Sequence, residues 1–152
     1  MDVRELIKAY LRQATMMQVA TVHGNKPWCS TMFFAFDEKW NLYWISKPTT
    51  KHSQHIEENL HVAGTIVMQQ DSRSSATIRG LQYEGTAEML NGDEEAMGAE
   101  CYRSRFGREA TFLEDIRSGN NPHKIYRIQP VKFVLCDRLN FPDAEIQELL
   151  LD

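Results

Sequence analysis

The sequence predicts a mainly β protein of the α+β class, a six-stranded antiparallel barrel with peripheral helices. Six β-prone runs follow one another, and most are joined by tight turns without the regular strand–helix alternation of parallel sheets. Helical patterns lie mainly at the two ends and between the fifth and sixth runs. No Gly-x-Gly-x-x-Gly follows any strand, which excludes a doubly wound parallel sheet. With 152 residues, the chain is expected to form one domain over 1–152.

The strands are predicted from runs rich in β-branched and aromatic residues. They are expected at Met17–Val22, Trp28–Phe36, Leu42–Ser46, His61–Met68, Thr77–Leu90 and Lys124–Asp137. Gly24-Asn25 predicts a hairpin turn between the first two, and Asp37–Asn41 predicts another turn. In the fifth strand Gly80 and Gly85 predict a bend or a bulge. Pro130 predicts an edge position or a break of the sixth run into two strands.

Helices are predicted from apolar spacing and from residues that cap helix ends. Asp2 can cap a first helix whose apolar side chains form one face: Val3, Leu6, Ile7, Tyr10 and Leu11. Asn91 opens a helix with acids in its first turn that stops at Gly107, and 109–116 suggests a short one. The spacing of Ile146, Leu149 and Leu150 predicts a last helix over Asp143–Leu151. Gln69–Ala76 is polar and Ser-rich, as in a loop.

One further helix is expected from Thr49 or Thr50 to about Leu60, and the composition of its first turn is unusual. Pro48 ends the preceding strand, and a threonine stands at the N-cap position. Lys51 and His52 then occupy a turn where acids are favoured and cations disfavoured. Hydroxyls, unpaired N–H groups and cations at one helix start are explained by an external anion, and phosphate suits them best. The alternative is a simple threonine cap with Lys51 in solvent.

Composition and charge exclude several functional classes. Apolar residues make up 42% and charged residues 25% of the chain, as in an ordinary globular protein. The net charge is −4 without an extended basic cluster, so we expect no nucleic-acid partner. The three cysteines are widely spaced and indicate reduced thiols in a cytoplasmic protein. We find no signal-peptide pattern and no apolar run of membrane-spanning length.

Other candidate sites have simpler explanations. His52, His55 and Glu58 are spaced three residues apart, as metal ligands on one helix face can be. The local sequence does not offer a full set of three ligands with residues to hold them in place, so no metal site is expected. Trp28, Trp40 and Trp44 could stack on a flavin, although buried aromatic residues are more common in a small barrel. No Gly-x-Ser-x-Gly or other nucleophile arrangement is present, so no catalytic residue is assigned.

Two segments carry a resemblance to a known family. They are Tyr-Trp-Ile-Ser-Lys-Pro-Thr-Thr-Lys-His-Ser-Gln-His-Ile-Glu-Glu-Asn-Leu, ending at Leu60, and Ile-Arg-Gly-Leu-Gln-Tyr-Glu-Gly-Thr-Ala-Glu-Met-Leu, ending at Leu90. With the order of elements from about Leu6 to Asp137, they resemble the pyridoxamine 5′-phosphate oxidase-like family of FMN-binding split-barrel proteins. The resemblance implies a homodimer with two FMN molecules at the subunit interface.

The resemblance also implies a set of FMN-binding residues. Thr50, Lys51 and His52 match the positions that hold the phosphate, and Ser46 would lie close to it. At the His52 position the family often has a second Lys or Arg, so the charge there depends on pH. The strand-two segment that lines the isoalloxazine ring corresponds to Ser30, Thr31 and Met32. Arg79 and Gln82 fall near the glutamine-bearing strand of the family, with Gly80 at the position of that glutamine.

One departure from the family bears on the reaction. True pyridoxamine-phosphate oxidases carry a C-terminal Trp and an Arg-x-His substrate motif, and this chain lacks that motif. The first hypothesis is therefore an FMN-dependent oxidoreductase for another small molecule. The alternatives are a non-catalytic flavin- or haem-binding protein on the same barrel, and an interaction domain that has lost its cofactor.

Overall fold

The computed structural model describes residues 2–68, 78–144 and 146–152, which form one antiparallel sheet with four helices around it. The elements are α1 (Val3–Gln13), β1 (Met16–His23), β2 (Lys26–Phe33), β3 (Ala35–Phe36), β4 (Leu42–Ser46), α2 (Lys51–Glu58), β5 (His61–Ile66), β6 (Arg79–Met89), α3 (Gly92–Phe106), α4 (Phe112–Ser118), β7 (Lys124–Asp137) and β8 (Ile146–Leu150). The prediction of a mainly β antiparallel fold with peripheral helices is confirmed.

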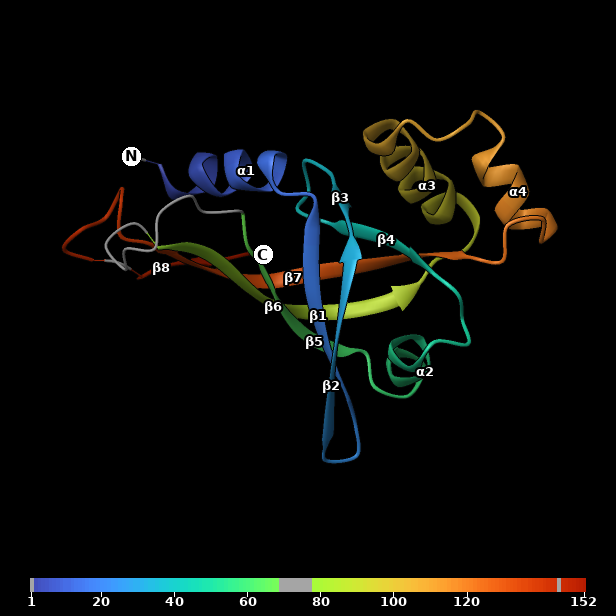
Figure 1. The fold of residues 1–152 in the computed structure, drawn as a ribbon, viewed down its shortest axis with the longest axis horizontal. Coiled ribbons are helices and arrows are strands. Elements are labelled where there is room, and N and C mark those ends of the chain that lie inside the picture. Colours follow the sequence, from blue (N-terminus) through green and yellow to red (C-terminus); the bar gives the residue numbers. More distant parts are fainter. Residues whose placement is uncertain (1, 69–77, 145) are drawn as a thin grey trace.

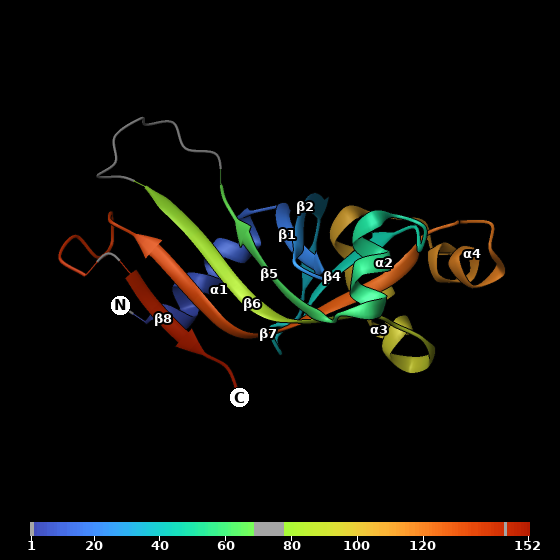
Figure 2. The same ribbon diagram turned by 90° about the horizontal axis from the view of Figure 1, so that it is seen from below.

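The sheet is built on two long central strands. Its hydrogen-bonded order is β2-β1-β5-β6-β7-β4-β3, and β8 adds to β7 beyond the end of β4. The β1–β2 hairpin crosses the direction of β6 and β7, while α3 and α4 lie together at one end of the molecule (Figure 1). Figure 2 shows β6 and β7 running side by side through most of the length of the molecule. None of the described helices is long and apolar enough to cross a membrane.

A β-bulge bends the central pair of strands. The register places Glu84 opposite Lys132 but Gly85 opposite Pro130, so one residue of β7 has no partner. A side chain at Gly85 would collide with backbone, because its Cβ would lie 2.2 Å from the Gln129 carbonyl oxygen. The bulge predicted from glycine is therefore confirmed at Gly85.

Two apolar clusters lie on opposite faces of the sheet. The larger one packs α1 against the concave face, and Trp44, Phe34 and Phe133 are fully buried in it. The smaller one packs α3 and α4 against β4 and β7, with Tyr43 and Tyr102 among its members. Because β4 contributes Trp44 to one cluster and Tyr43 to the other, it is buried on both faces.

Most predicted elements lie where the sequence placed them, within a few residues. The strand Leu42–Ser46 and the last long strand have the predicted bounds, and Asp2 and Gly107 cap α1 and α3. The predicted strand Trp28–Phe36 is divided into β2 and the short β3. The predicted Gln69–Ala76 loop lies wholly outside the described residues.

One local prediction was wrong. Residues 146–150 form β8 and not a helix, since the β7 edge beyond β4 pairs with them from Cys136 to Lys132. Of the two alternatives for Pro130, the edge position is confirmed and the break is not. Pro130 lies next to the bulged residue of β7, on an edge left unpaired between the last residue paired with β4, Ile128, and the first paired with β8, Lys132. The missing N–H of proline therefore falls where regular pairing is already interrupted.

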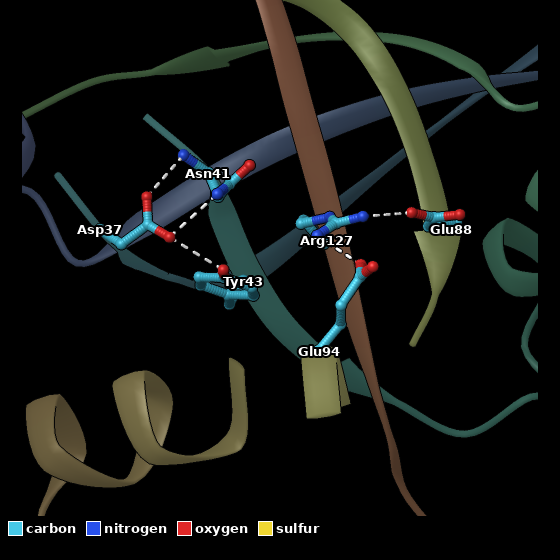
Figure 3. Close-up of polar contacts among 6 residues, drawn as sticks. All are labelled: Asp37, Asn41, Tyr43, Glu88, Glu94 and Arg127. Atoms are coloured by element: carbon cyan, nitrogen blue, oxygen red, sulfur yellow. Dashed lines mark hydrogen bonds and ion pairs between the residues drawn. The ribbon is translucent and has the colours of Figure 1, made fainter. Parts of the chain in front are cut away.

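Two polar networks lie close together around β4 and β7 (Figure 3). The Arg127 guanidinium on β7 binds Glu88 of β6 and, at 2.6 Å, Glu94 of α3. The Asp37 carboxylate accepts a hydrogen bond of 2.9 Å from the Tyr43 hydroxyl and 3.0 Å from the Asn41 N–H. The first network ties the start of α3 to the sheet, and the second closes the β3–β4 turn.

The bulge makes a testable prediction about stability. Gly85→Ala is expected to lower the free energy of unfolding by about 1–3 kcal/mol, because backbone atoms of Gln129 and Pro130 must move. Gly80→Ala is the matched control on the same strand, since no atom lies within 4 Å of the added Cβ. Urea denaturation measures both. Equal stability of the two variants would contradict this account of the bulge.

Candidate functional site

The start of α2 is capped by Thr50, the second of the two predicted threonines. Thr50 has extended backbone (φ −70°, ψ 155°), and its side chain accepts a hydrogen bond from the Ser53 N–H. The first turn contains no acid. The N–H groups of Lys51 and His52 have no acceptor within the helix, because the first N–H groups of any helix lack one. This helix start therefore carries partial positive charge without a carboxylate of its own.

The His52 ring lies in a cluster of hydroxyl groups. Its Nδ1 is 3.2 Å from Ser30 Oγ, and its Nε2 is 2.7 Å from Ser46 Oγ and 3.1 Å from Thr50 Oγ1. Thr50 Oγ1 also lies 2.7 Å from Ser53 Oγ. These residues come from β2, β4 and the first turn of α2. Four predicted site residues, Ser30, Ser46, Thr50 and His52, are thus brought together.

The contacts of His52 are compatible with its neutral form. The Trp44 indole N–H can only donate, and it donates to Ser46 Oγ at 3.0 Å. In the neutral form that fits these contacts, Ser46 gives its own proton to His52 Nε2, and Nδ1 carries the ring proton and donates to Ser30 Oγ. Burial and, secondarily, the neighbouring His55 lower the pKa of His52, which favours this neutral form. A nearby anion would instead stabilise the protonated ring.

Lys51 supplies the permanent charge at this helix start. Its Nζ lies 4.0 Å from the centre of the Trp28 ring, and both side chains are exposed. Among the described residues, Lys51 has no ion pair with an acid. The ammonium group is consequently available to an anion from solvent.

Four other predicted residues lie outside the cluster. Met32 points into the main core, where 9% of it is exposed. Thr31 and Gln82 lie in one row across the opposite, exposed face of the sheet, joined through Gln18 and Thr65. Arg79 begins β6 opposite Asp137, three residues from Gln82. The structure therefore does not bring Arg79 or Gln82 to the start of α2.

The site also contains residues that the sequence analysis did not select. Trp44 and Ser53 position the Ser46 and Thr50 hydroxyls, and Tyr126 stacks on Trp44 with ring centres 5.1 Å apart. The i, i+2 spacing of Trp44 and Ser46 on a strand and the i, i+3 spacing of Thr50 and Ser53 at a cap could have indicated the first two. No local signal could have placed Tyr126, which comes from β7.

Two other histidines, His55 of α2 and His23 at the end of β1, lie next to each other. His55 is buried and its Nδ1 is 3.0 Å from Thr21 Oγ1, while its ring stacks on His23. His23 Nδ1 lies 2.5 Å from the Glu58 carboxylate. Over the described residues, no group of three His, Cys, Asp or Glu side chains could hold a metal ion.

The convex face of the sheet, termed here the outer face, carries two rows of small and polar residues. Successive strands contribute Thr31, Gln18, Thr65, Gln82, Val134 and Glu148 to one row, and Cys29, Ala20, Ala63, Glu84, Lys132 and Leu150 to the other. Two shallow depressions of about 570 and 400 Å³ adjoin at Ala20, Ala63 and Glu84. Exposed Val131 and Leu150 border this hollow, which is mostly apolar.

Comparison with known proteins gives both sequence relatives and structural neighbours. A UPF0306 protein of Yersinia pseudotuberculosis is 36% identical over 102 residues, which span 66% of this chain and 68% of that protein. General stress protein 26 of Bacillus anthracis has a TM-score of 0.70 at 19% identity, with 99% of this chain and 100% of that chain covered. HutZ, the heme storage protein of Vibrio cholerae, has a TM-score of 0.68 at 19% identity, with coverage of 86% and 91%.

These structural neighbours share the split-barrel fold, and at such identities they show the fold alone. The family model described as Pyridoxamine 5′-phosphate oxidase matches residues 3–136, which include α2 and all strands except β8. The chain therefore belongs to the pyridoxamine 5′-phosphate oxidase family.

Proposed function

We propose that the protein binds FMN at a homodimer interface and acts as a flavin-dependent oxidoreductase on a small molecule. The observation that carries this proposal is the start of α2, where hydroxyls, an imidazole and an unpaired ammonium group meet without an acid. A phosphate monoester is the matching ligand, because its oxygens accept hydrogen bonds and its charge suits a helix N-terminus. Family membership supports the proposal.

The donor set fits the phosphate of FMN. Lys51 would contribute charge, and the N–H groups of the first turn and the hydroxyls of Thr50 and Ser46 would donate hydrogen bonds. His52 would add a donor once it is protonated. The bound flavin supplies hydride or electron transfer, while the residues of this chain hold and orient it. Thr31 and Gln82 lie on the outer face, and we assign them to the surroundings of the ring.

Lys51→Ala is expected to weaken FMN binding about tenfold, because an exposed charge-assisted contact is worth about 1.5 kcal/mol. Titration of FMN fluorescence measures the dissociation constant. Lys39→Ala is the matched control, since Lys39 is an exposed lysine in the β3–β4 turn. Unchanged affinity of Lys51→Ala, or equal losses in both variants, would place the phosphate elsewhere.

The lowered pKa of His52 predicts how FMN affinity depends on pH. A phosphate next to the ring favours the imidazolium, so binding takes up a proton. Affinity is then highest below the lowered pKa of the free protein. It falls as the pH rises from that value to the higher pKa of the complex.

Two variants isolate the His52 contribution from the ionisation of FMN itself. His52→Lys keeps the positive charge throughout this pH window, and His52→Gln stays neutral. The phosphate of free FMN ionises identically in every titration, so the ratio of wild-type to variant affinity removes this contribution and reports the effect of residue 52. We expect both ratios to fall with rising pH in calorimetric titrations. Ratios independent of pH would remove His52 from the phosphate site.

The outer face supports the proposed homodimer. It is lined by small residues such as Ala20, Ala63 and Cys29, and exposed Val131 and Leu150 lie on or next to it. Exposed apolar surface of this kind is typical of interfaces between subunits. Glu84 and Lys132, 3.6 Å apart, lie within the same face and bring opposite charges to it.

Ala63→Arg is expected to shift the protein toward a monomer, because it puts a bulky charge at the centre of the outer face. Sedimentation velocity measures the oligomeric state, and FMN titration measures the accompanying loss of affinity. Ser118→Arg, at the exposed end of α4, is the control. A monomeric wild-type protein, or a dimer that tolerates Ala63→Arg, would contradict an interface on this face.

Haem binding on the same barrel is the second candidate, favoured by the structural likeness to the heme storage protein HutZ. A visible absorption spectrum separates the two cofactors, because flavin and haem absorb at different wavelengths. Flavin reduction by NAD(P)H with turnover on an acceptor would support an enzyme, whereas a bound flavin inert to the nicotinamide would support a carrier.

We also propose a cytoplasmic location, which the free thiols Cys29, Cys101 and Cys136 support.

A further inference from the structure

A further cavity lies beside α2, and neither Lys51 nor Trp28 lines it. Its volume is about 430 Å³, within the range of small-molecule sites. α2 and the residues next to it contribute Pro48, Ser53, Ile56, Glu57 and Leu60, and the end of β6 and the start of β7 contribute Ala87, Glu88, Met89, Lys124 and Tyr126. The cavity shares Ser53 with the His52 cluster and has no residue in common with the two depressions of the outer face.

The walls of this cavity are predominantly apolar. Ile56 and Ala87 are buried, whereas Leu60 and Met89 are about half exposed. The Tyr126 ring is held by stacking on Trp44, with ring centres 5.1 Å apart. Such a cavity can take an aromatic or branched aliphatic group, which would displace water from Ile56 and Ala87.

The charged side chains around the cavity differ in whether they have a partner. The Glu88 carboxylate is already engaged by Arg127, which Glu94 also binds (Figure 3). The Lys124 ammonium is directed at the Ile116 carbonyl oxygen, 3.4 Å away. Glu57 is exposed and has no ion pair within the described residues, and it raises the pKa of Tyr126 after the larger effect of burial. At the rim of this apolar cavity, Glu57 is thus a carboxylate without an ion-pair partner, although the Lys124 side chain also lines the cavity.

We propose that this cavity binds an amphipathic cation, an amine carried on an aromatic or branched aliphatic body, with its ammonium group at Glu57. The apolar body would contact Ile56, Ala87 and Met89. Carboxylate and ammonium groups at the rim of an apolar site attract each other through a medium less polar than water. This inference does not depend on FMN, because none of the residues that carry it contributes to the phosphate cluster.

The test uses two probes with the same ring and opposite charge, 2-phenylethylamine and phenylacetate. Methyl-labelled protein reports binding through the NMR signals of Ile56, Leu60, Ala87 and Met89. We expect the amine to shift these methyl signals in a saturable manner and phenylacetate to bind at least about threefold more weakly, as for a partly exposed ion pair. Repeating the titration with added FMN shows whether the cavity binds independently of the flavin.

Two neighbouring glutamates provide the matched variants. Glu57→Gln is expected to weaken binding of the amine about threefold and to leave phenylacetate unaffected or slightly improved. Glu58→Gln is the control, because Glu58 pairs with His23 and does not line the cavity. The proposal is overturned if neither probe shifts these methyl signals, if the two probes bind equally, or if the two variants have the same effect.

Discussion

The curvature of the sheet is the constraint on which the rest of the structure depends. Ser30 on β2 and Ser46 on β4 lie in strands separated by four others in the hydrogen-bonded order. In a flat sheet those strands would be about 24 Å apart, at about 4.8 Å per strand. Both hydroxyls nevertheless contact the same imidazole, His52, at 3.2 and 2.7 Å. The bulge at Gly85, opposite Pro130, contributes to this curvature.

The closed cluster explains how a histidine is accommodated at the positive end of a helix. A cation there would be disfavoured by the helix dipole and by burial. Hydroxyl groups from three elements can satisfy the neutral ring instead, and the Trp44 indole N–H holds the Ser46 hydroxyl in place. The same groups can turn to an anion when one arrives, which makes the arrangement suited to reversible phosphate binding.

α2 separates two regions of different chemistry. One side presents Lys51 and the His52 cluster, with positive charge and hydrogen-bond donors. The other presents an apolar cavity with the carboxylate of Glu57 at its rim. Ser53 belongs to both, because its hydroxyl lies 2.7 Å from Thr50 Oγ1 and the residue also lines the cavity. A helix of eight residues can border two sites because side chains within one turn point to different sides of the helix.

The sequence by itself determined the class of fold, most strands and the start of α2. These features depend on local chemistry, such as alternation along a strand, a threonine cap and the missing acids of the first turn. It also indicated Thr50, Lys51 and His52, which are neighbours in the chain. β8 was mistaken for a helix because its leucine spacing is ambiguous, and the free edge of β7 decided its conformation. Only the tertiary structure decided that Ser30 and Ser46 meet at His52. It also decided that Gln82 and Arg79 lie away from this cluster, and that Tyr126 lines a cavity beside α2. These relations depend on the curl of the sheet, which joins residues far apart in the chain and which no local pattern encodes.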